Sequence, residues 1–245
     1  MKLGKKIIIP LVFWLVVWQA VSMAVGIDLL FPGPWTVLRT LTGLIVTSGF
    51  WHATALTLLR IFAGMLAGVV LGTLIAVLTC VSTWCDCILS PLVKVIRATP
   101  VASFILLVLL WVSTGKVPGV ISALMVLPVI WGNVSKGIKE TDPQLLELAR
   151  AYRFGRFRTL KLVYIPSVAP YFTAGVETAL GLAWKAGVAA EVLCYPKWAI
   201  GAEIYHARLN FETPDLFAWT LVVIALSFLV ETALVRLLRK AVRHG

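Results

Sequence analysis

Four charged residues stand within or close to stretches of the chain that are otherwise apolar. They are Arg60, Arg97, Glu177 and Lys185. If these stretches cross a membrane, each charge is costly and should face other helices or a watery cavity. Glu177 and Lys185 are eight residues apart and lie on nearly the same side of one helix, too far apart to touch. Each should therefore pair elsewhere, and Arg60 and Arg97 are the candidates.

Two functions are open for these charges: ionic links between helices, or contact with a solute that passes through the protein. Pro100 follows Arg97 closely and should interrupt a helix, because proline has no backbone N–H. The carbonyl groups that it frees are tolerated at membrane depth only inside protein or beside water. A plain kink is the alternative to lining of a solute path. The three cations would suit an anion.

The composition indicates a protein that crosses the membrane several times. The chain is 60% hydrophobic and 13% charged, with a mean hydropathy of +0.95, which a soluble domain could not solvate. We expect an all-α membrane protein with six transmembrane helices and one transmembrane domain over residues 1–245. Within it, the span at 7–26 is additional to a core at 50–238. The six apolar segments lie at about 7–26, 53–80, 88–113, 117–135, 167–194 and 215–236.

Positive charge predicts the orientation of these spans. The net charge is +11, and the basic residues cluster at the ends of apolar segments rather than along one polar face, so no nucleic-acid partner is expected. With both termini in the cytoplasm, the inner loops and ends carry 14 Lys and Arg residues and the outer loops carry four. This excess agrees with the positive-inside rule.

The densest basic segment, 136–166, is predicted to form a structured cytoplasmic loop. Thr141 or Asp142 can cap a helix, Pro143 suits its first turn, and Gln144 can complete a capping box with Thr141. Gly155 offers a left-handed stop to that helix. A second short helix is expected at 156–164, before the next span.

One face of the first loop helix should be apolar, because apolar residues recur there at helical spacing. These residues are Leu145, Leu148, Ala149 and Tyr152. Two interpretations follow from the pattern alone. The helix pair can dock a partner protein, or it can bury its leucines among lipid headgroups.

The same segment resembles the EAA loop of binding-protein-dependent ABC transporter permeases. The resemblance lies in Glu147-Leu148-Ala149, followed by Ile165-Pro166 and Pro170. Leu148 replaces the first alanine of the motif, and the motif's glycine position falls on Arg153, with Gly155 two residues further on. In this family the loop helix sits in a groove of the ATPase subunit. The ATPase-coupling residues that the resemblance implies are Glu147, Leu148, Ala149, Tyr152, Arg153 and Gly155.

Other segments are similar to permeases of the nitrate, sulfonate and taurine type, and the likeness extends from about Leu30 to Leu238. It is carried by the runs Leu30-Phe31-Pro32-Gly33-Pro34, Thr57-Leu58-Leu59-Arg60, Gly181-Leu182-Ala183-Trp184-Lys185 and Ala189-Ala190-Glu191, and by Gly64, Gly68 and Gly72. These three glycines share one helix face and predict close helix packing. That packing lies either within the subunit or at a dimer or moving interface.

The resemblance implies the permease subunit of an ATP-driven importer in the bacterial inner membrane. Its partners would be two ABC ATPase subunits, a second permease chain in a homodimer, an extracytoplasmic solute-binding protein and the lipid bilayer. The solute would be small and polar, of the nitrate, sulfonate or taurine kind, and would pass Arg60, Arg97, Pro100, Glu177 and Lys185. Glu203 and Arg208 would contact the binding protein, and the coupling loop would occupy 140–166.

No catalytic residue, metal site or cofactor is expected, and the chain lacks the Gly-rich phosphate-binding motif of an ATPase. The main alternative is a self-sufficient proton-coupled secondary transporter that uses Glu177 as its proton carrier. Against it, the sequence shows no inverted repeat. A membrane-integral enzyme would need a cluster of polar groups at one depth, which the apolar segments do not show.

Overall fold

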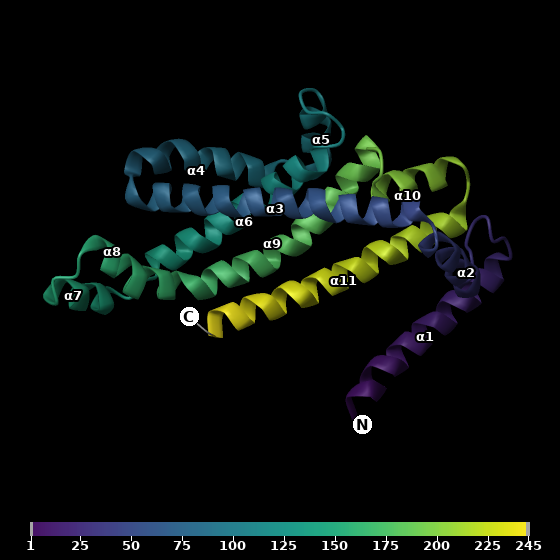
Figure 1. The fold of residues 1–245 in the computed structure, drawn as a ribbon, viewed down its shortest axis with the longest axis horizontal. Coiled ribbons are helices and arrows are strands. Elements are labelled where there is room, and N and C mark those ends of the chain that lie inside the picture. The colour runs from purple at the N-terminus through teal and green to yellow at the C-terminus, as the bar shows by residue number, and fades with distance from the viewer. Residues whose placement is uncertain (1, 244–245) are drawn as a thin grey trace. The chain divides into compact units, whose positions relative to one another are not determined.

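The computed structural model describes residues 2–243, with side-chain environments between 8 and 236. In that part of the chain every regular element is a helix, so the all-α prediction is confirmed (Figure 1). The elements are α1 (Lys2–Val25), α2 (Pro34–Ile45), α3 (Ser48–Val81), α4 (Thr83–Ala98), α5 (Val101–Leu109), α6 (Val117–Lys139), α7 (Pro143–Ala151), α8 (Arg156–Thr159), the π-helix η1 (Leu160–Tyr164), α9 (Ile165–Cys194), α10 (Ile200–Leu209) and α11 (Thr213–Arg243).

Among the described residues, four helices are long and apolar enough to cross a membrane: α1, α3, α6 and α11. A fifth span exists if α4 and α5, which are bent by 106°, cross as a pair. The helix α9 has 30 residues, enough length to cross, but Glu177, Lys185 and Glu191 make it less apolar. The count of six spans and the position of the termini therefore stay predictions.

The predicted segment at 88–113 is two helices rather than one. α4 ends at Ala98, Thr99 is extended with φ −78° and ψ 131°, and Pro100 is the N-cap of α5. A residue that precedes proline is driven out of the helical region by the proline ring. The predicted interruption at Pro100 is confirmed, and it is a sharp break.

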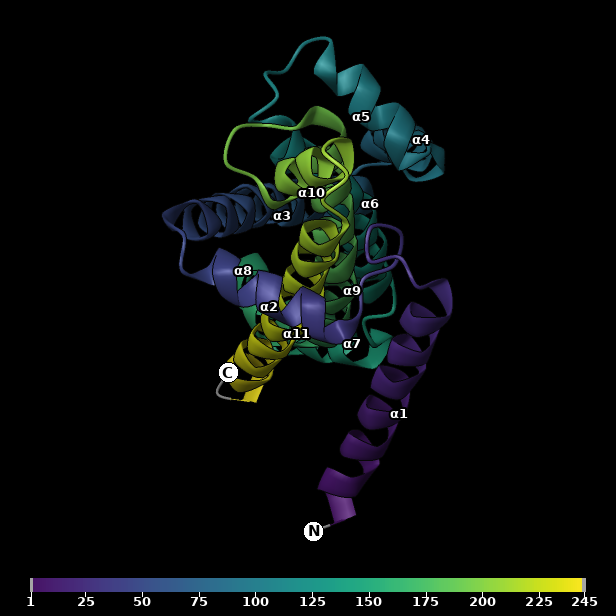
Figure 2. The ribbon, with the colours of Figure 1, turned by 90° about the vertical axis from the view of Figure 1, so that its right-hand side faces the viewer.

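The chain forms two compact units. The first contains residues 1–57 and 191–226, and the second contains 58–190 and 227–245. The core of the first unit joins Phe50, Ile200 and Trp219, and the rings of Phe50 and Trp219 stack with centroids 5.1 Å apart. Leu41 and Leu44 of α2 pack against this core, which brings α2 beside the first turns of α11 (Figure 2).

In the second unit, α3 packs on α6 through the three glycines. A Cβ at Gly68 would lie 2.6 Å from the carbonyl oxygen of Ala123, and one at Gly72 would lie 2.8 Å from that of Leu127. A Cβ at Gly64 would overlap the backbone of Gly119. The glycine face is therefore filled by α6 of the same chain. This confirms packing within the subunit.

The helix α9 joins this pair through small residues as well. A Cβ at Gly187 would lie 2.6 Å from Cγ1 of Ile61 and 2.7 Å from the hydroxyl of Ser122. The same Ser122 hydroxyl lies 3.1 Å from the carbonyl oxygen of Ala183, as a donor. The helices α3, α6 and α9 thus form the framework on which the candidate sites of the second unit stand.

Candidate functional sites

The start of α7 has one cap. The carboxylate of Asp142 accepts a hydrogen bond from the backbone N–H of Gln144 at 2.8 Å, and Pro143 occupies the first turn, where no N–H is needed. The hydroxyl of Thr141 donates instead to the carbonyl of Gly137, inside α6. Of the two predicted caps, Asp142 is confirmed, and the capping box with Thr141 does not form.

The end of α7 is closed by a Schellman motif. The N–H of Phe154 donates to the carbonyl of Ala149 at 2.8 Å, and the N–H of Arg153 donates to that of Arg150 at 2.9 Å. Arg153 is left-handed, with φ +52°. Gly155 has φ −67° and ψ 160°, so the prediction that Gly155 supplies the left-handed stop is wrong. Arg153, at the glycine position of the motif, takes the conformation that glycine favours.

Three of the four residues of the predicted apolar face of α7 are exposed, and the fourth, Ala149, is buried. Ala149 is 3% exposed, whereas Leu148 is 54% exposed and Tyr152 is 70% exposed. Leu145 and Glu147 are exposed too. Ala149 is buried and Leu146 half-buried, whereas Leu145, Leu148 and Tyr152 are accessible to a partner or to lipid.

The second predicted loop helix, at 156–164, is the beginning of α9. α8 passes into the π-helix η1, and η1 passes into α9 at Ile165 without a break at Pro166. The guanidinium of Arg158 lies 4.5 Å from the ring centroid of Phe154, which holds α8 against the end of α7. A π-helix turn is a local widening of the helix that often marks a functional segment.

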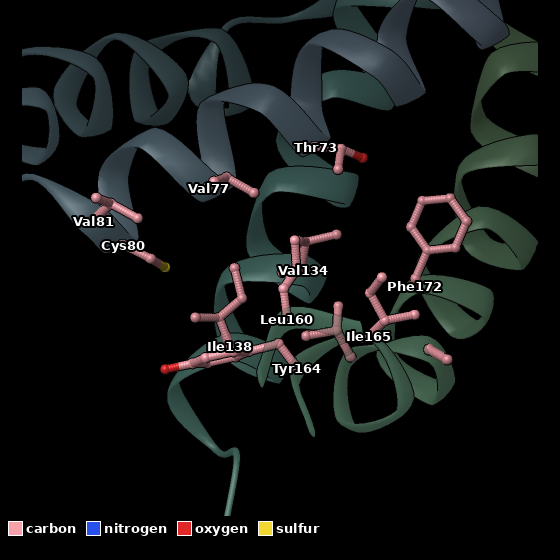
Figure 3. A pocket seen from close by; sticks show the side chains of 12 residues that line it. Thr73, Val77, Cys80, Val81, Val134, Ile138, Leu160, Tyr164, Ile165 and Phe172 are labelled. Atoms are coloured by element: carbon pink, nitrogen blue, oxygen red, sulfur yellow. The ribbon is translucent and has the colours of Figure 1, made fainter. Parts of the chain in front are cut away.

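An apolar cavity of about 450 Å³ lies behind η1. It is enclosed by residues of α3, α6, η1 and α9, among which Cys80, Val134 and Phe172 lie around the space (Figure 3). Leu160 and Tyr164 of η1 line it as well. The π-helix therefore shares one apolar cavity with α3, α6 and α9.

The end of α6 is tied to α9 next to the loop. The hydroxyl of Tyr171 donates to the carboxylate of Glu140, and the ammonium of Lys136 lies 3.8 Å from the same carboxylate. A Cβ at Gly137 would lie 3.0 Å from the ring of Tyr171. The end of α6, where the 140–166 loop begins, therefore lies beside the part of α9 that follows the loop.

The structure separates the predicted pathway residues. Arg60 borders a hollow of about 390 Å³ together with Lys116. Arg97 borders a different cavity, of about 620 Å³. Glu177 and Lys185 lie on α9, and within the described residues neither forms an ion pair. The expected pairing with Arg60 or Arg97 is not found.

The larger cavity contains polar residues that the sequence interpretation did not place in the pathway. Asn133, Lys136 and Thr178 line it beside Arg97. Asn133 and Thr178 lie on α6 and α9, in helices that the sequence does locate. Their positions at one cavity follow only from the packing of Gly175 against Asn133, where a Cβ would lie 3.0 Å from the Asn133 Cβ.

In the first unit, a buried carboxylate holds the start of α10. Glu191 is fully buried, and its Oε2 accepts hydrogen bonds from Thr57 at 2.9 Å and from the N–H of Gly201 at 3.2 Å. The Thr57 hydroxyl accepts from the N–H of Ile200 at 3.0 Å. Glu191 and Thr57 together replace the missing side-chain cap of Ala199.

The predicted binding-protein contacts lie on this helix. Glu203 is half-buried and borders a hollow of about 230 Å³ with Lys197 and His206. Arg208 is exposed in the last turn. Both side chains belong to the first unit, and no described contact joins them to each other.

Residues 68–244 match the family described as "Binding-protein-dependent transport system inner membrane component". The chain belongs to this family, whose members are permease subunits of ABC transporters and not themselves enzymes. The resemblance seen in the sequence is thereby confirmed.

Three permease proteins from other bacteria are similar to this chain over nearly its whole length. The chain is 26% identical to the putative aliphatic sulfonates transport permease protein SsuC of Bacillus subtilis, covering 96% of this chain and 85% of the relative. It is 26% identical to the taurine transport system permease protein TauC of Escherichia coli, covering 92% and 84%. It is 24% identical to the bicarbonate transport system permease protein CmpB of Synechococcus elongatus, covering 94% and 87%.

Solved structures share the fold. A bacterial ABC transporter involved in the import of the acidic polysaccharide alginate superposes with a TM-score of 0.65 at 17% identity, covering 99% of this chain and 95% of that chain. An amino acid ABC transporter crystallised with histidines gives 0.58 at 19% identity, covering 77% and 90%.

Proposed function

We propose that this chain is the membrane-spanning permease subunit of an ATP-driven importer in a bacterial inner membrane. The observation that carries the proposal is the exposed apolar face of α7, on a helix that is capped at both ends. Leu148 is 54% exposed, and Tyr152 is 70% exposed although its ring contacts that of Phe154. The neighbouring Arg150 and Arg153 are exposed as well. A rigid helix that presents apolar and basic groups together is suited to a groove on another protein.

The proposed partners are two ATPase subunits on the cytoplasmic face, a second copy of this chain and a solute-binding protein outside. When ATP brings the two ATPases together, α7 would move with the ATPase groove that holds it. The motion would reach α6 through the short connection at Thr141 and α9 through η1. Tilting of packed helices would then open the path outward, and hydrolysis would reset it.

The solute is proposed to be a small anion. The relatives named above transport, by their names, aliphatic sulfonates, taurine and bicarbonate, each of which carries an oxyanion group. Arg97 and Lys136 border a partly polar cavity of about 620 Å³ in the second unit. Cations in a low-dielectric setting attract an anion strongly.

Copurification tests the coupling segment. The tagged chain, extracted from its native membrane in mild detergent, should bring a stoichiometric ATPase. Changing both Glu147 and Tyr152 to Ala should remove that ATPase. The control is Phe211→Ala, which deletes an aromatic ring of similar exposure, 73% against 70%, on the segment after α10.

Wild-type chain that purifies without any ATPase, also under gentle crosslinking, would contradict the proposal. Uptake driven by a proton gradient alone, and lost in Glu177→Gln, would then indicate a secondary transporter. Retention of the ATPase in the double variant would keep the importer and remove α7 from its contact surface.

A further inference from the structure

The cavity beside Arg97 lies between three helices of the second unit. Arg97 comes from the last turn of α4, Asn133 and Lys136 come from α6, and Thr178 comes from α9. Its volume of about 620 Å³ is in the range of small-molecule sites. Arg97 and Thr178 are exposed in the isolated chain, and such polar groups are unfavourable against lipid. This side of the second unit should therefore meet water or protein.

Of the two cations that line this cavity, Arg97 is the one available to bind a ligand. Lys136 lies 3.8 Å from Glu140 and is partly neutralised by it. Within the described residues, Arg97 has neither an ion-pair nor a hydrogen-bond partner. Among the residues whose side chains the structure describes, no carboxylate lines the cavity, and Glu177 is next to Thr178 in sequence but outside the lining. The electrostatic balance of the site therefore favours an anion.

The remaining polar groups can add hydrogen bonds. Nδ2 of Asn133 donates one hydrogen to the carbonyl of Val129 at 2.8 Å, which leaves its second hydrogen for a ligand. The Thr178 hydroxyl donates to the carbonyl of Ala174 at 3.0 Å and can rotate away. Apolar side chains complete the wall: Ile96, Met125, Pro128, Val129 and Leu182.

We propose that this cavity binds the oxyanion head of the transported solute during its passage, with Arg97 as the main ligand and Asn133 as a second donor. The planar guanidinium fork matches two oxygens of a sulfonate or carboxylate. The apolar wall suits a short organic body, so the site takes a small organic anion, of the sulfonate kind, better than a bare inorganic ion. This inference rests on the proposed function and deepens it.

Cysteine labelling tests the charge preference directly. Thr178→Cys is made in a chain whose four native cysteines are replaced by alanine, and the complex is labelled in membranes. The two probes are the anionic 2-sulfonatoethyl methanethiosulfonate and its cationic trimethylammonium counterpart, each rate being divided by the rate with a free thiol. A cation-lined cavity raises local anion concentration by about tenfold or more. The anionic reagent should therefore react at least about tenfold faster.

Arg97→Gln should abolish this preference. Lys94→Gln removes a cation from an exposed position of the same helix, outside the lining, and should preserve it. Leu182→Cys provides a second labelling position on the wall if Thr178→Cys fails to assemble. Equal normalised rates for the two reagents, no labelling at either position, or a preference unchanged by Arg97→Gln would overturn the proposal. ATPase copurification is read in the same membranes, so failure of the importer itself is distinguishable.

Discussion

At the scale of single residues, Arg153 shows that backbone hydrogen bonds can place the left-handed residue at the end of a helix on a residue other than glycine. The sequence interpretation assigned the helix stop to Gly155, because glycine has no Cβ and enters the left-handed region freely. The Schellman bonds from Arg153 and Phe154 fix the left-handed residue two positions earlier. Nothing in a single sequence states how many turns α7 makes before it closes.

Arg153→Gly should stabilise the end of α7. A left-handed residue with a Cβ costs about 1 kcal/mol, and glycine removes that cost. The amide hydrogens of residues 143–154 should therefore exchange about fivefold more slowly in this variant. Arg150→Gly, inside α7, should act in the opposite direction, because interior glycine costs about 1 kcal/mol. Faster exchange in Arg153→Gly would contradict the left-handed assignment.

Thr57 is a second residue whose importance lies in a contact across the sequence. It donates to Glu191 and accepts from the N–H of Ile200, residues more than 130 positions away. Thr57→Val keeps the volume but removes both bonds within a buried site. The expected loss of stability is about 1–3 kcal/mol. Thr42→Val, which removes one exposed local bond to Arg39, should change stability little.

The thermal midpoint of the purified chain in detergent measures this difference. A Thr57→Val variant as stable as Thr42→Val would mean that the Glu191 contact contributes nothing to folding. In the sequence, Glu191 stands out only as part of the run Ala189-Ala190-Glu191, which is similar to permeases of the nitrate, sulfonate and taurine type. The partner is hidden because hydrogen bonds between distant helices leave no periodic signal.

At the scale of elements, the sequence predicts the long helices well but misses the short helix α2. The spans at 7–26, 53–80, 117–135 and 215–236 correspond to α1, α3, α6 and α11. The helix α2 was not predicted, although Pro34 starts it and Leu41 and Leu44 mark its buried side. A helix of 12 residues is too short to give a membrane-length signal.

The packing of α3 on α6 predicts opposite effects for two glycine substitutions. Gly64→Ala should destabilise the chain strongly, because its Cβ would overlap the backbone of Gly119, which cannot move aside like a flexible side chain. Gly43→Ala in α2 meets no atom within 4 Å and should be neutral or stabilising by up to about 1 kcal/mol. Expression and thermal midpoint, compared for the two variants, measure the difference. Equal behaviour would mean that α3 and α6 are not in close contact.

At the scale of the whole molecule, composition and basic clusters predict class and orientation, whereas packing decides the sites. The membrane class, the helical fold and the presence of a short helix after residue 142 were evident from the sequence. The cavity beside Arg97 was not, because Asn133 and Thr178 look like ordinary polar residues of two separate helices. Their common position depends on which faces of α6 and α9 meet, and small residues such as Gly175 determine that.

The predicted crossing of the membrane by α9 can be tested directly. We expect it to cross, because the face that carries Gly187 and Gly175 is covered by α3 and α6 and need not meet lipid. Alkaline phosphatase, which is active only outside the cytoplasm, should then be inactive when inserted after Gly155 and active when inserted after Phe211. A fluorescent protein that folds only in the cytoplasm should give the reverse pattern. The same readout at both positions would mean that α9 does not cross, and the loop at 140–166 could not then be assigned to the cytoplasm by its charge alone.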